Sequence, residues 1–342
     1  MNRKFHNAIN GIPQSIPPIW FMRQAGRYHS HYQNLRKKYS FEELCKNSEL
    51  AAEVACGPID DFDYDVAILF SDILYPLELF DLDLSYNPGP TFKDYLKPSD
   101  IKKNIDNGMV EEHLNFQSDA IKLTKEVLST DKSLVGFIGG PWTILSYGLN
   151  YKSKISVDNI TKEDFIEILL YEKLIPILRK NIQMQFEAGV EIVYIFDTNS
   201  KQLESKYFLG SYLQSLKENL FRPFEKKIAY FSKNESFYDE NKLKDNSQYL
   251  AGTVYPMSTG FGEFIKSKKG IFVQGNFSPE ALLKPHEEYL VYFEEFLHNM
   301  KRLNQKDRSG WICSLSHGVL PKTPEENVRH FIHSIRDEFS EG

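Results

Sequence analysis

Eight short runs of apolar and β-branched residues recur along the chain, and they constrain its fold more than any other feature of the sequence. Several runs are nearly continuous in apolar residues, which is typical of strands that are covered on both faces in a parallel sheet. The predicted strands are residues 17–22, 66–70, 134–138, 192–196, 227–231, 249–254, 271–274 and 311–315. The chain is therefore expected to build one parallel sheet.

Stretches with helical spacing lie between the predicted strands, and several of them follow a Ser, Thr or Asp that can cap a helix. The clearest are residues 41–56, 164–188, 205–221 and 279–300. Strand and helix alternate along all 342 residues without a flexible linker or a low-complexity tract. This alternation favours a single α/β domain over residues 1–342, and eight strands favour closure into a (β/α)8 TIM-type barrel. A doubly wound open sheet is the alternative.

Two segments are expected to lie outside the regular barrel. Residues 77–134 exceed an ordinary crossover, and the sequence YNPGP at residues 86–90 predicts an extended loop or a small hairpin within them. Residues 232–245 are rich in Lys, Asn and Glu, and we interpret them as a solvated surface loop.

The formal net charge of −6 at pH 7 argues against a nucleic-acid or anionic-membrane partner, because such partners usually select a basic face. No apolar run approaches the ~20 residues that cross a bilayer. Residues 1–10 also lack the apolar core of a signal peptide. We therefore expect a cytoplasmic protein without a membrane partner, in which a local cluster of positive charge holds any anionic ligand.

Cysteine and histidine are placed without a disulfide or metal-binding pattern. Cys45, Cys56 and Cys313 are far apart in the sequence, which suits reduced, buried thiols. The closest histidine pair, His29 and His31, has no nearby Cys or Glu-x-x-His pattern to complete a site. Neither redox chemistry nor a metal site is expected.

Polar or glycine-rich residues directly follow five of the eight predicted strands. Catalytic residues of a (β/α)8 barrel lie at the carboxyl ends of its strands. These positions hold residues 23–27, 71–72, 139–143, 197–198 and 316–318. The sequence therefore predicts an active site at that end of the barrel.

Three charged residues at these strand ends can do chemical work. Arg23 and Arg27 are four positions apart and can present two guanidinium groups for bidentate capture of carboxylates or phosphates. A surface ion-pair cluster is the alternative for these two arginines. Asp72 ends a buried run, where an unpaired charge is costly, so it needs a partner or a catalytic task. A salt bridge to Arg23 or Arg27 would also satisfy it.

Three further side chains, Tyr147, Thr198 and His317, can donate a hydrogen bond to a ligand, although a single Tyr or His in a core is more often structurally satisfied. The turn at residues 136–143 could bind an anion through backbone amides. It lacks the spacing and the lysine of a Walker loop. Nucleotide binding is therefore disfavoured.

Residues 18–27, PIWFMRQAGR, resemble the amino-terminal signature of the uroporphyrinogen decarboxylase family. Five further blocks are similar to that family and occur in the same order. They are FSDIL at 70–74, GFIGGPWT at 136–143, FDT at 196–198, QGN at 274–276 and SHGVLPKTPEENV at 316–328. The resemblance thus covers nearly the whole chain.

The resemblance implies a single, somewhat distorted barrel that forms a homodimer with facing active-site clefts and uses no metal and no organic cofactor. It implies decarboxylation of the four acetate side chains of uroporphyrinogen III to methyl groups, giving coproporphyrinogen III and four CO2 in haem or chlorophyll biosynthesis. It also implies catalytic roles for Asp72, Arg23 and Arg27. The implied substrate contacts are Arg23, Gln24, Ala25, Gly26, Arg27, Asp72, Tyr147, Thr198 and His317.

The chemistry of this substrate suits those residue types. Uroporphyrinogen is a flexible cyclic tetrapyrrole with eight carboxylates and four inward-pointing pyrrole N–H groups, so arginines suit its rim and the Asp72 carboxylate suits its centre. Protonation of the pyrrole carbon beside an acetate arm supplies the electron sink for loss of CO2. We hypothesise that Asp72 stabilises the resulting cation electrostatically and that an arginine supplies the proton.

The sequence departs from the family pattern at residues 28–32, 199–200 and 255–257 and at Ser278, close to the predicted site. A catalytically degenerate relative that binds a tetrapyrrole or a protein partner is therefore one alternative. A zinc-dependent methyltransferase that uses corrinoid proteins, from the same superfamily, is another. It needs a His-x-Cys motif, and no cysteine in this chain has a histidine two residues before it.

Overall fold

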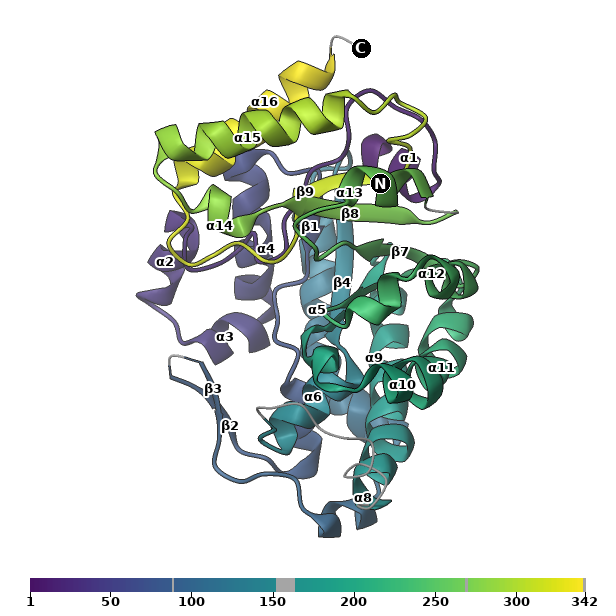
Figure 1. The fold of residues 1–342 in the computed structure, drawn as a ribbon. Coiled ribbons are helices and arrows are strands. Elements are labelled where there is room, and N and C mark those ends of the chain that lie inside the picture. The colour runs from purple at the N-terminus through teal and green to yellow at the C-terminus, as the bar shows by residue number, and fades with distance from the viewer. Residues whose placement is uncertain (88, 152–163, 268–269, 341–342) are drawn as a thin grey trace.

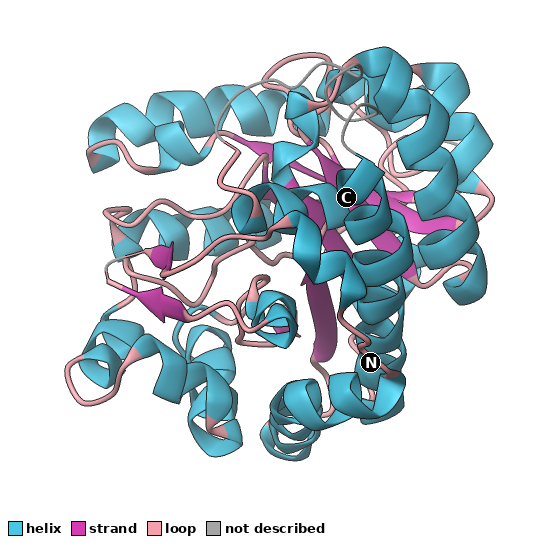
Figure 2. Ribbon diagram, turned by 90° about the horizontal axis from the view of Figure 1, so that it is seen from below, coloured by secondary structure: helices cyan, strands magenta, loops and turns pink. Residues whose placement is uncertain are grey.

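The computed structural model describes residues 1–87, 89–151, 164–267 and 270–340. A sheet of seven parallel strands forms its centre, and the order of the strands in the sheet equals their order along the chain. Helices surround this sheet (Figures 1 and 2). The strands are β1 (Val66–Ile68), β4 (Ser133–Gly139), β5 (Val193–Asp197), β6 (Ile228–Ser232), β7 (Leu250–Val254), β8 (Phe272–Phe277) and β9 (Trp311–Leu315). The predicted α/β class with a parallel, barrel-like sheet is confirmed.

The α-helices within the described part of the chain are α1 (Arg3–Ile9), α2 (Ser30–Arg36), α3 (Phe41–Lys46), α4 (Ser48–Phe62), α5 (Asn107–Val127), α6 (Pro141–Gly148), α8 (Asp164–Glu167), α9 (Ile175–Ala188), α10 (Ser205–Tyr207), α11 (Leu213–Leu216), α12 (Glu240–Ser247), α13 (Phe261–Ser267), α14 (Pro279–Leu282), α15 (His286–Lys301) and α16 (Glu325–Ser340). The 3-10 helices are η1 (Tyr75–Phe80), η2 (Pro98–Lys102), η4 (Thr198–Gln202), η7 (Arg222–Phe224) and η8 (Glu235–Tyr238). The π-helical turns are η3 (Ile168–Leu174), η5 (Phe208–Tyr212) and η6 (Lys217–Phe221).

Local sequence signals account for several helix boundaries. Ser40 and Glu43 form a reciprocal capping box at the start of α3, which satisfies backbone N–H groups that the helix leaves free. The α9 helix ends at Gly189, whose φ of 113° suits a residue without a side chain. Lys125 lies against Gly189 on the outside of the barrel, within 2.6 Å of where a Cβ would stand.

The first predicted strand, residues 17–22, is reduced to one parallel bridge between Ile19 and Cys313 of β9. The Cys313 N–H donates to the carbonyl of Pro18 (2.9 Å), and the Asp65 N–H, just before β1, donates to the carbonyl of Ile19 (3.0 Å). The segment therefore bonds to both edges of the seven-stranded sheet. It pairs over so short a length because the chain turns immediately afterwards, where the Gln24 N–H donates to the carbonyl of Phe21 (3.1 Å).

The long segment after β1 carries a two-stranded antiparallel hairpin of β2 (Leu84–Tyr86) and β3 (Pro90–Phe92). The hairpin lies apart from the main sheet (Figure 1), so the prediction of a loop or small hairpin there is confirmed. The interpretation of residues 232–245 as a solvated loop is wrong. They contain η8 and most of α12, and Phe237, Tyr238 and Leu243 are buried, because a few apolar residues anchor an otherwise polar segment to the core.

The main hydrophobic core draws on residues from Phe5 to Phe339. Trp20, beside the short bridge, meets Tyr194 of β5 edge to face with ring centroids 4.9 Å apart. Phe331 of α16 contacts Phe21 edge to face (5.3 Å), a geometry that aromatic pairs favour. It also contacts Phe277 of β8 with its ring tilted (5.2 Å). These contacts fix the start of the loop at residues 23–27 against the carboxyl half of the barrel.

Candidate active site

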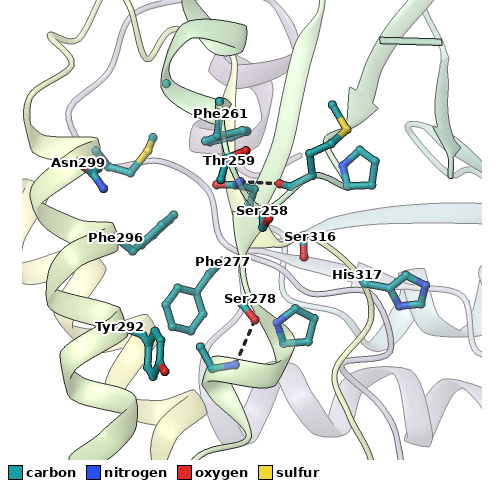
Figure 3. A pocket seen from close by; sticks show the side chains of 18 of the residues that line it. Ser258, Thr259, Phe261, Phe277, Ser278, Tyr292, Phe296, Asn299, Ser316 and His317 are labelled. Carbon is teal, nitrogen blue, oxygen red and sulfur yellow. Dashed lines mark hydrogen bonds between the residues drawn. The ribbon is translucent and has the colours of Figure 1, made fainter. Parts of the chain in front are cut away.

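A cavity of about 1470 Å³ opens where β7, β8 and β9 end. Figure 3 shows Ser258, Thr259 and Phe261 on one side, Ser316 and His317 on another, and Tyr292, Phe296 and Asn299 of α15 on a third. The Asn276 side chain donates to the carbonyl of Met257 (3.0 Å) and so links two walls. The cavity lies at the carboxyl ends of parallel strands, where barrel enzymes have their active sites.

Arg23 reaches the cavity from the turn that follows the short bridge. Its φ of 61° lies in the left-handed region, which costs energy for a residue other than glycine and persists only where the surroundings hold it. Gly318 leaves room for its side chain, because a Cβ at that position would lie 2.6 Å from the Arg23 Cδ atom. The glycine after His317 therefore lets the arginine extend past β9.

His317 lines the same cavity, directly after β9. Burial, together with the positive charges of Lys233, Arg23 and Lys201, lowers the pKa of its imidazole to about 4. Its ring meets Phe231 edge to face, with centroids 5.7 Å apart. His317 is therefore neutral at pH 7 and offers a hydrogen bond rather than a charge.

Asp72 lies in the turn after β1, where one of its oxygens accepts the backbone N–H of Leu74 (2.8 Å). Burial raises the pKa of its carboxyl group, and the Leu74 N–H, the Tyr86 hydroxyl and the positive charge of Arg23 oppose that rise. No salt bridge joins Asp72 to Arg23 or Arg27 in the described chain. Its carboxylate therefore has no cationic partner within that part of the chain, and Asp72 is not among the residues that line the cavity.

Residues 24–27, which follow Arg23 in the predicted site, differ in burial and in their contacts. Gln24 is buried, accepts the Phe21 N–H (3.3 Å) and donates to the carbonyl of Val66 (2.9 Å), so its side chain fastens the loop to β1. Ala25 and Gly26 are partly buried, and Arg27 is exposed. None of these four residues lines the cavity.

Thr198 and Tyr147 also lie outside the cavity wall. Thr198 is partly buried at the start of η4, and Tyr147 on α6 is 39% exposed. The preceding residue, Asp197, is fully buried and accepts hydrogen bonds from the Thr143 hydroxyl (2.7 Å), Tyr212 (2.6 Å) and Tyr230 (2.9 Å). Burial raises the pKa of the Asp197 carboxyl group, although these hydrogen bonds act to lower it. The network fixes the start of η4.

Two residues that the sequence did not single out, Lys201 and Lys233, line the cavity with Arg23 and His317. Lys201 lies in η4, three positions after Thr198, and Lys233 directly follows β6. Their position after predicted strands is the signal that could have drawn attention to them. Among the predicted site residues, the structure brings Arg23 and His317 together in the cavity and places Asp72 within electrostatic reach of Arg23.

Two further observations bear on the kind of protein. In the described part of the chain, no three His, Cys, Asp or Glu side chains are grouped so that they could hold a metal ion. The helices described here are all too short or too polar to span a bilayer.

A parallel α/β sheet curled as in a barrel, with titratable side chains around a cavity at its carboxyl end, defines an enzyme-like protein of the TIM-barrel class. Residues 1–338 match the family model described as uroporphyrinogen decarboxylase (URO-D). The chain belongs to the uroporphyrinogen decarboxylase family.

Individual relatives agree with this membership. The uroporphyrinogen decarboxylase of Geobacter sulfurreducens is 33% identical, with 98% of each chain covered. That of Helicobacter acinonychis is 34% identical, with 94% of each covered, and that of Orientia tsutsugamushi is 32% identical, with 98% of each covered. The similarity therefore extends from one end of each protein to the other.

The solved structures support the fold. A methyltransferase from Methanosarcina mazei aligns with a TM-score of 0.69 over 98% of both chains, at 18% sequence identity. A putative vitamin-B12-independent methionine synthase from Listeria monocytogenes aligns with a TM-score of 0.53 over 96% of this chain and 98% of its own, at 12% identity. At such identities the likeness concerns the fold alone.

Proposed function

We propose that this chain decarboxylates the four acetate side chains of uroporphyrinogen III to methyl groups, giving coproporphyrinogen III and four CO2 in tetrapyrrole biosynthesis. The observation that carries this assignment is the family match over residues 1–338, supported by full-length relatives with that activity in their names. The chain is accordingly a carboxy-lyase. A cavity with cationic groups at the carboxyl end of the barrel suits a polyanionic substrate.

Asp72 is the proposed central catalytic residue. A carboxylate with free acceptor capacity can accept several pyrrole N–H groups at once and so fix the macrocycle in a bent form. When a pyrrole carbon is protonated, the ring becomes cationic. The electrons of the acetate C–C bond then flow into it as CO2 leaves, and protonation of the remaining carbon gives the methyl group. Loss of the proton first added to the ring restores the neutral pyrrole, so each CO2 released consumes one proton. A buried carboxylate stabilises that cation more strongly than a solvated one.

The arginines are proposed to bind the substrate rim and to supply the proton. Arg23 is favoured for both tasks because its side chain lines the cavity beside His317. Arg27 would join it only if its exposed side chain turns inward when the substrate binds. Contacts by residues 24–26, Tyr147 and Thr198 stay predictions of the family resemblance, since these residues, like Asp72, are not among those that line the cavity.

The test is an anaerobic incubation of the purified protein with uroporphyrinogen III, followed by oxidation and chromatographic counting of the remaining carboxyl groups. The wild type is expected to produce the four-carboxylate product in steps. The Asp72→Asn variant keeps the shape of the side chain and removes its charge, so we expect it to fold normally and lose about 100-fold or more in kcat.

An Asp72→Asn protein with full turnover would remove Asp72 from the mechanism. A wild type that leaves all carboxyl groups intact, under conditions where a control decarboxylase works, would instead favour the degenerate tetrapyrrole-binding relative. Circular dichroism of both proteins excludes misfolding as the cause of either result.

We further propose that the chain is one cytoplasmic domain and assembles as a homodimer. Full-length similarity to relatives of the same length supports one unit. Light scattering on the purified protein is expected to give about twice the chain mass of 39.8 kDa, in line with the prevalence of twofold assemblies. A mass of one chain at micromolar concentration would contradict the dimer.

A further inference from the structure

Three cations that line the cavity have no salt-bridge partner in the described part of the chain. Arg23, Lys201 and Lys233 line it together, and none of them takes part in a salt bridge or a side-chain hydrogen bond within the described residues. Lys266, which also lines the cavity, pairs instead with Glu263 (3.0 Å). Like charges that gather without counter-charges raise the energy of the folded chain.

A buried hydrogen-bond network holds the two lysines side by side. The Ser200 and Ser232 hydroxyls are 2.7 Å apart, and each belongs to the residue immediately before one of the lysines. The Asn234 side chain, on the residue immediately after Lys233, donates to the carbonyls of Ser200 (3.2 Å) and Leu203 (3.1 Å). The turn after β5 is thus joined to the turn after β6, and the backbone positions of the two lysines cannot separate without breaking buried bonds.

The charges around Lys233 show that the cluster is unbalanced. Lys233 is partly buried, and burial lowers the pKa of its ammonium group; Lys201 and Arg23 lower it further. Glu280 opposes them with the smallest contribution, and its carboxylate already accepts the Ser278 hydroxyl (2.9 Å). A partly buried, unpaired ammonium group held next to two cations is costly unless an anion occupies the space in front of it.

We propose that Lys201 and Lys233 form a carboxylate-binding subsite with Arg23, which holds side-chain carboxylates of the tetrapyrrole while its pyrrole N–H groups face Asp72. The assignment rests on the proposed function, because it takes the substrate to be a polycarboxylate. It adds two binding residues that are absent from the predicted site residues and from the family blocks. Two point charges on flexible stems suit carboxylates that differ in position from one reaction step to the next, whereas the arginine gives a fixed bidentate contact.

The test replaces each lysine with methionine, which keeps the aliphatic stem and removes the charge. With uroporphyrinogen III, each of Lys201→Met and Lys233→Met is expected to raise KM about tenfold, with a smaller change in kcat, because one charge-assisted contact is lost. Lys201→Arg restores a charge and is expected to recover most of the affinity. Lys206→Met is the matched control, since Lys206 is exposed on the neighbouring α10 helix and does not line the cavity.

Thermal unfolding separates binding from a structural role. Removal of an unpaired cation from a cationic cluster relieves repulsion, so the melting temperature of the ligand-free Lys233→Met protein is expected to equal or exceed that of the wild type. A lower melting temperature together with an unchanged KM would mean that the lysine only supports the fold, and would overturn the subsite.

A titration with uroporphyrin III, the oxidised and unreactive octacarboxylate, distinguishes this proposal from the proposed function. If the wild type turns over substrate and both lysine variants keep its KM, the subsite fails and the function stands. If the wild type shows no turnover, the function fails, and the titration still decides the subsite. Weaker uroporphyrin binding in both methionine variants than in Lys206→Met supports it, and equal binding in all proteins overturns it.

Discussion

Asp72 combines a raised pKa with a proposed role that requires its ionised form. Burial disfavours the charged carboxylate, so the group stays protonated to a higher pH than an exposed aspartate does. As the pH falls through this raised pKa, the active form is lost. We therefore expect the acidic limb of the kcat/KM profile, which reports the free enzyme, to lie above the range of an ordinary carboxyl group.

Tyr86 offers a way to assign that limb. Its hydroxyl lowers the pKa of Asp72, and its ring packs on Phe41 with centroids 4.6 Å apart, so Tyr86→Phe keeps the packing and removes the hydroxyl. The acidic limb of Tyr86→Phe is expected to move to higher pH than that of the wild type. Titration of the substrate and of His317 is common to both proteins and cancels in the comparison. If the acidic limb of Tyr86→Phe stays in place or moves to lower pH, the titration of Asp72 does not cause that limb.

Single residues were predictable from sequence where a strand end determines the position of the side chain. Arg23 and His317 were predicted on that basis, and the structure brings them into one cavity. The position of Gln24 after a predicted strand does not reveal that its side chain donates a hydrogen bond to the carbonyl of Val66. The lysines at 201 and 233 were not predicted, since their convergence depends on buried bonds between turns that are far apart in sequence.

At the scale of the elements, apolar runs located the strands of the main sheet. The predicted strand 311–315 matches β9, and the ends of the other strands lie within three residues of their predicted positions. Burial on both faces gives parallel strands a strong signal. The exception is residues 17–22, where the apolar pattern persists although only Ile19 pairs with β9. Apolar character reports burial, and it does not report how many backbone groups bond to a neighbouring strand.

Elements that carry the site are joined by polar contacts that no periodicity encodes. Asp197 at the end of β5 binds Thr143 at the start of α6 and Tyr230 of β6. In segment 232–245, which was wrongly predicted to be a solvated loop, the polar composition gave no sign that Asn234 is buried. The Asn234 side chain joins η4 to the turn after β6. Composition predicts solvation on average, whereas individual buried polar side chains are set by their partners.

For the whole molecule, the net charge and the local charge have opposite signs. The chain carries −6, which repels a polyanionic substrate, while the cavity end lined by Arg23, Lys201 and Lys233 attracts it. At ~5 Å with an effective dielectric constant of ~20, each cation is worth about 3 kcal/mol per substrate charge. The net charge, acting through water over ~20 Å, amounts to about 1 kcal/mol before screening, and a Debye length of about 8 Å removes most of that.

The local cluster should therefore determine how salt acts on the enzyme. We expect kcat/KM for uroporphyrinogen III to fall as ionic strength rises from about 10 to 150 mM, since salt screens the attraction that draws the substrate into the cavity. The Lys201→Met/Lys233→Met double variant is expected to show a shallower fall, and Lys206→Met the same slope as the wild type. If kcat/KM instead rises with salt, repulsion by the net negative charge dominates, and the cavity does not act as the electrostatic entrance. Sodium chloride titrations at fixed pH give the slopes directly, and a neutral osmolyte at matched osmolality controls for effects of the solvent on stability.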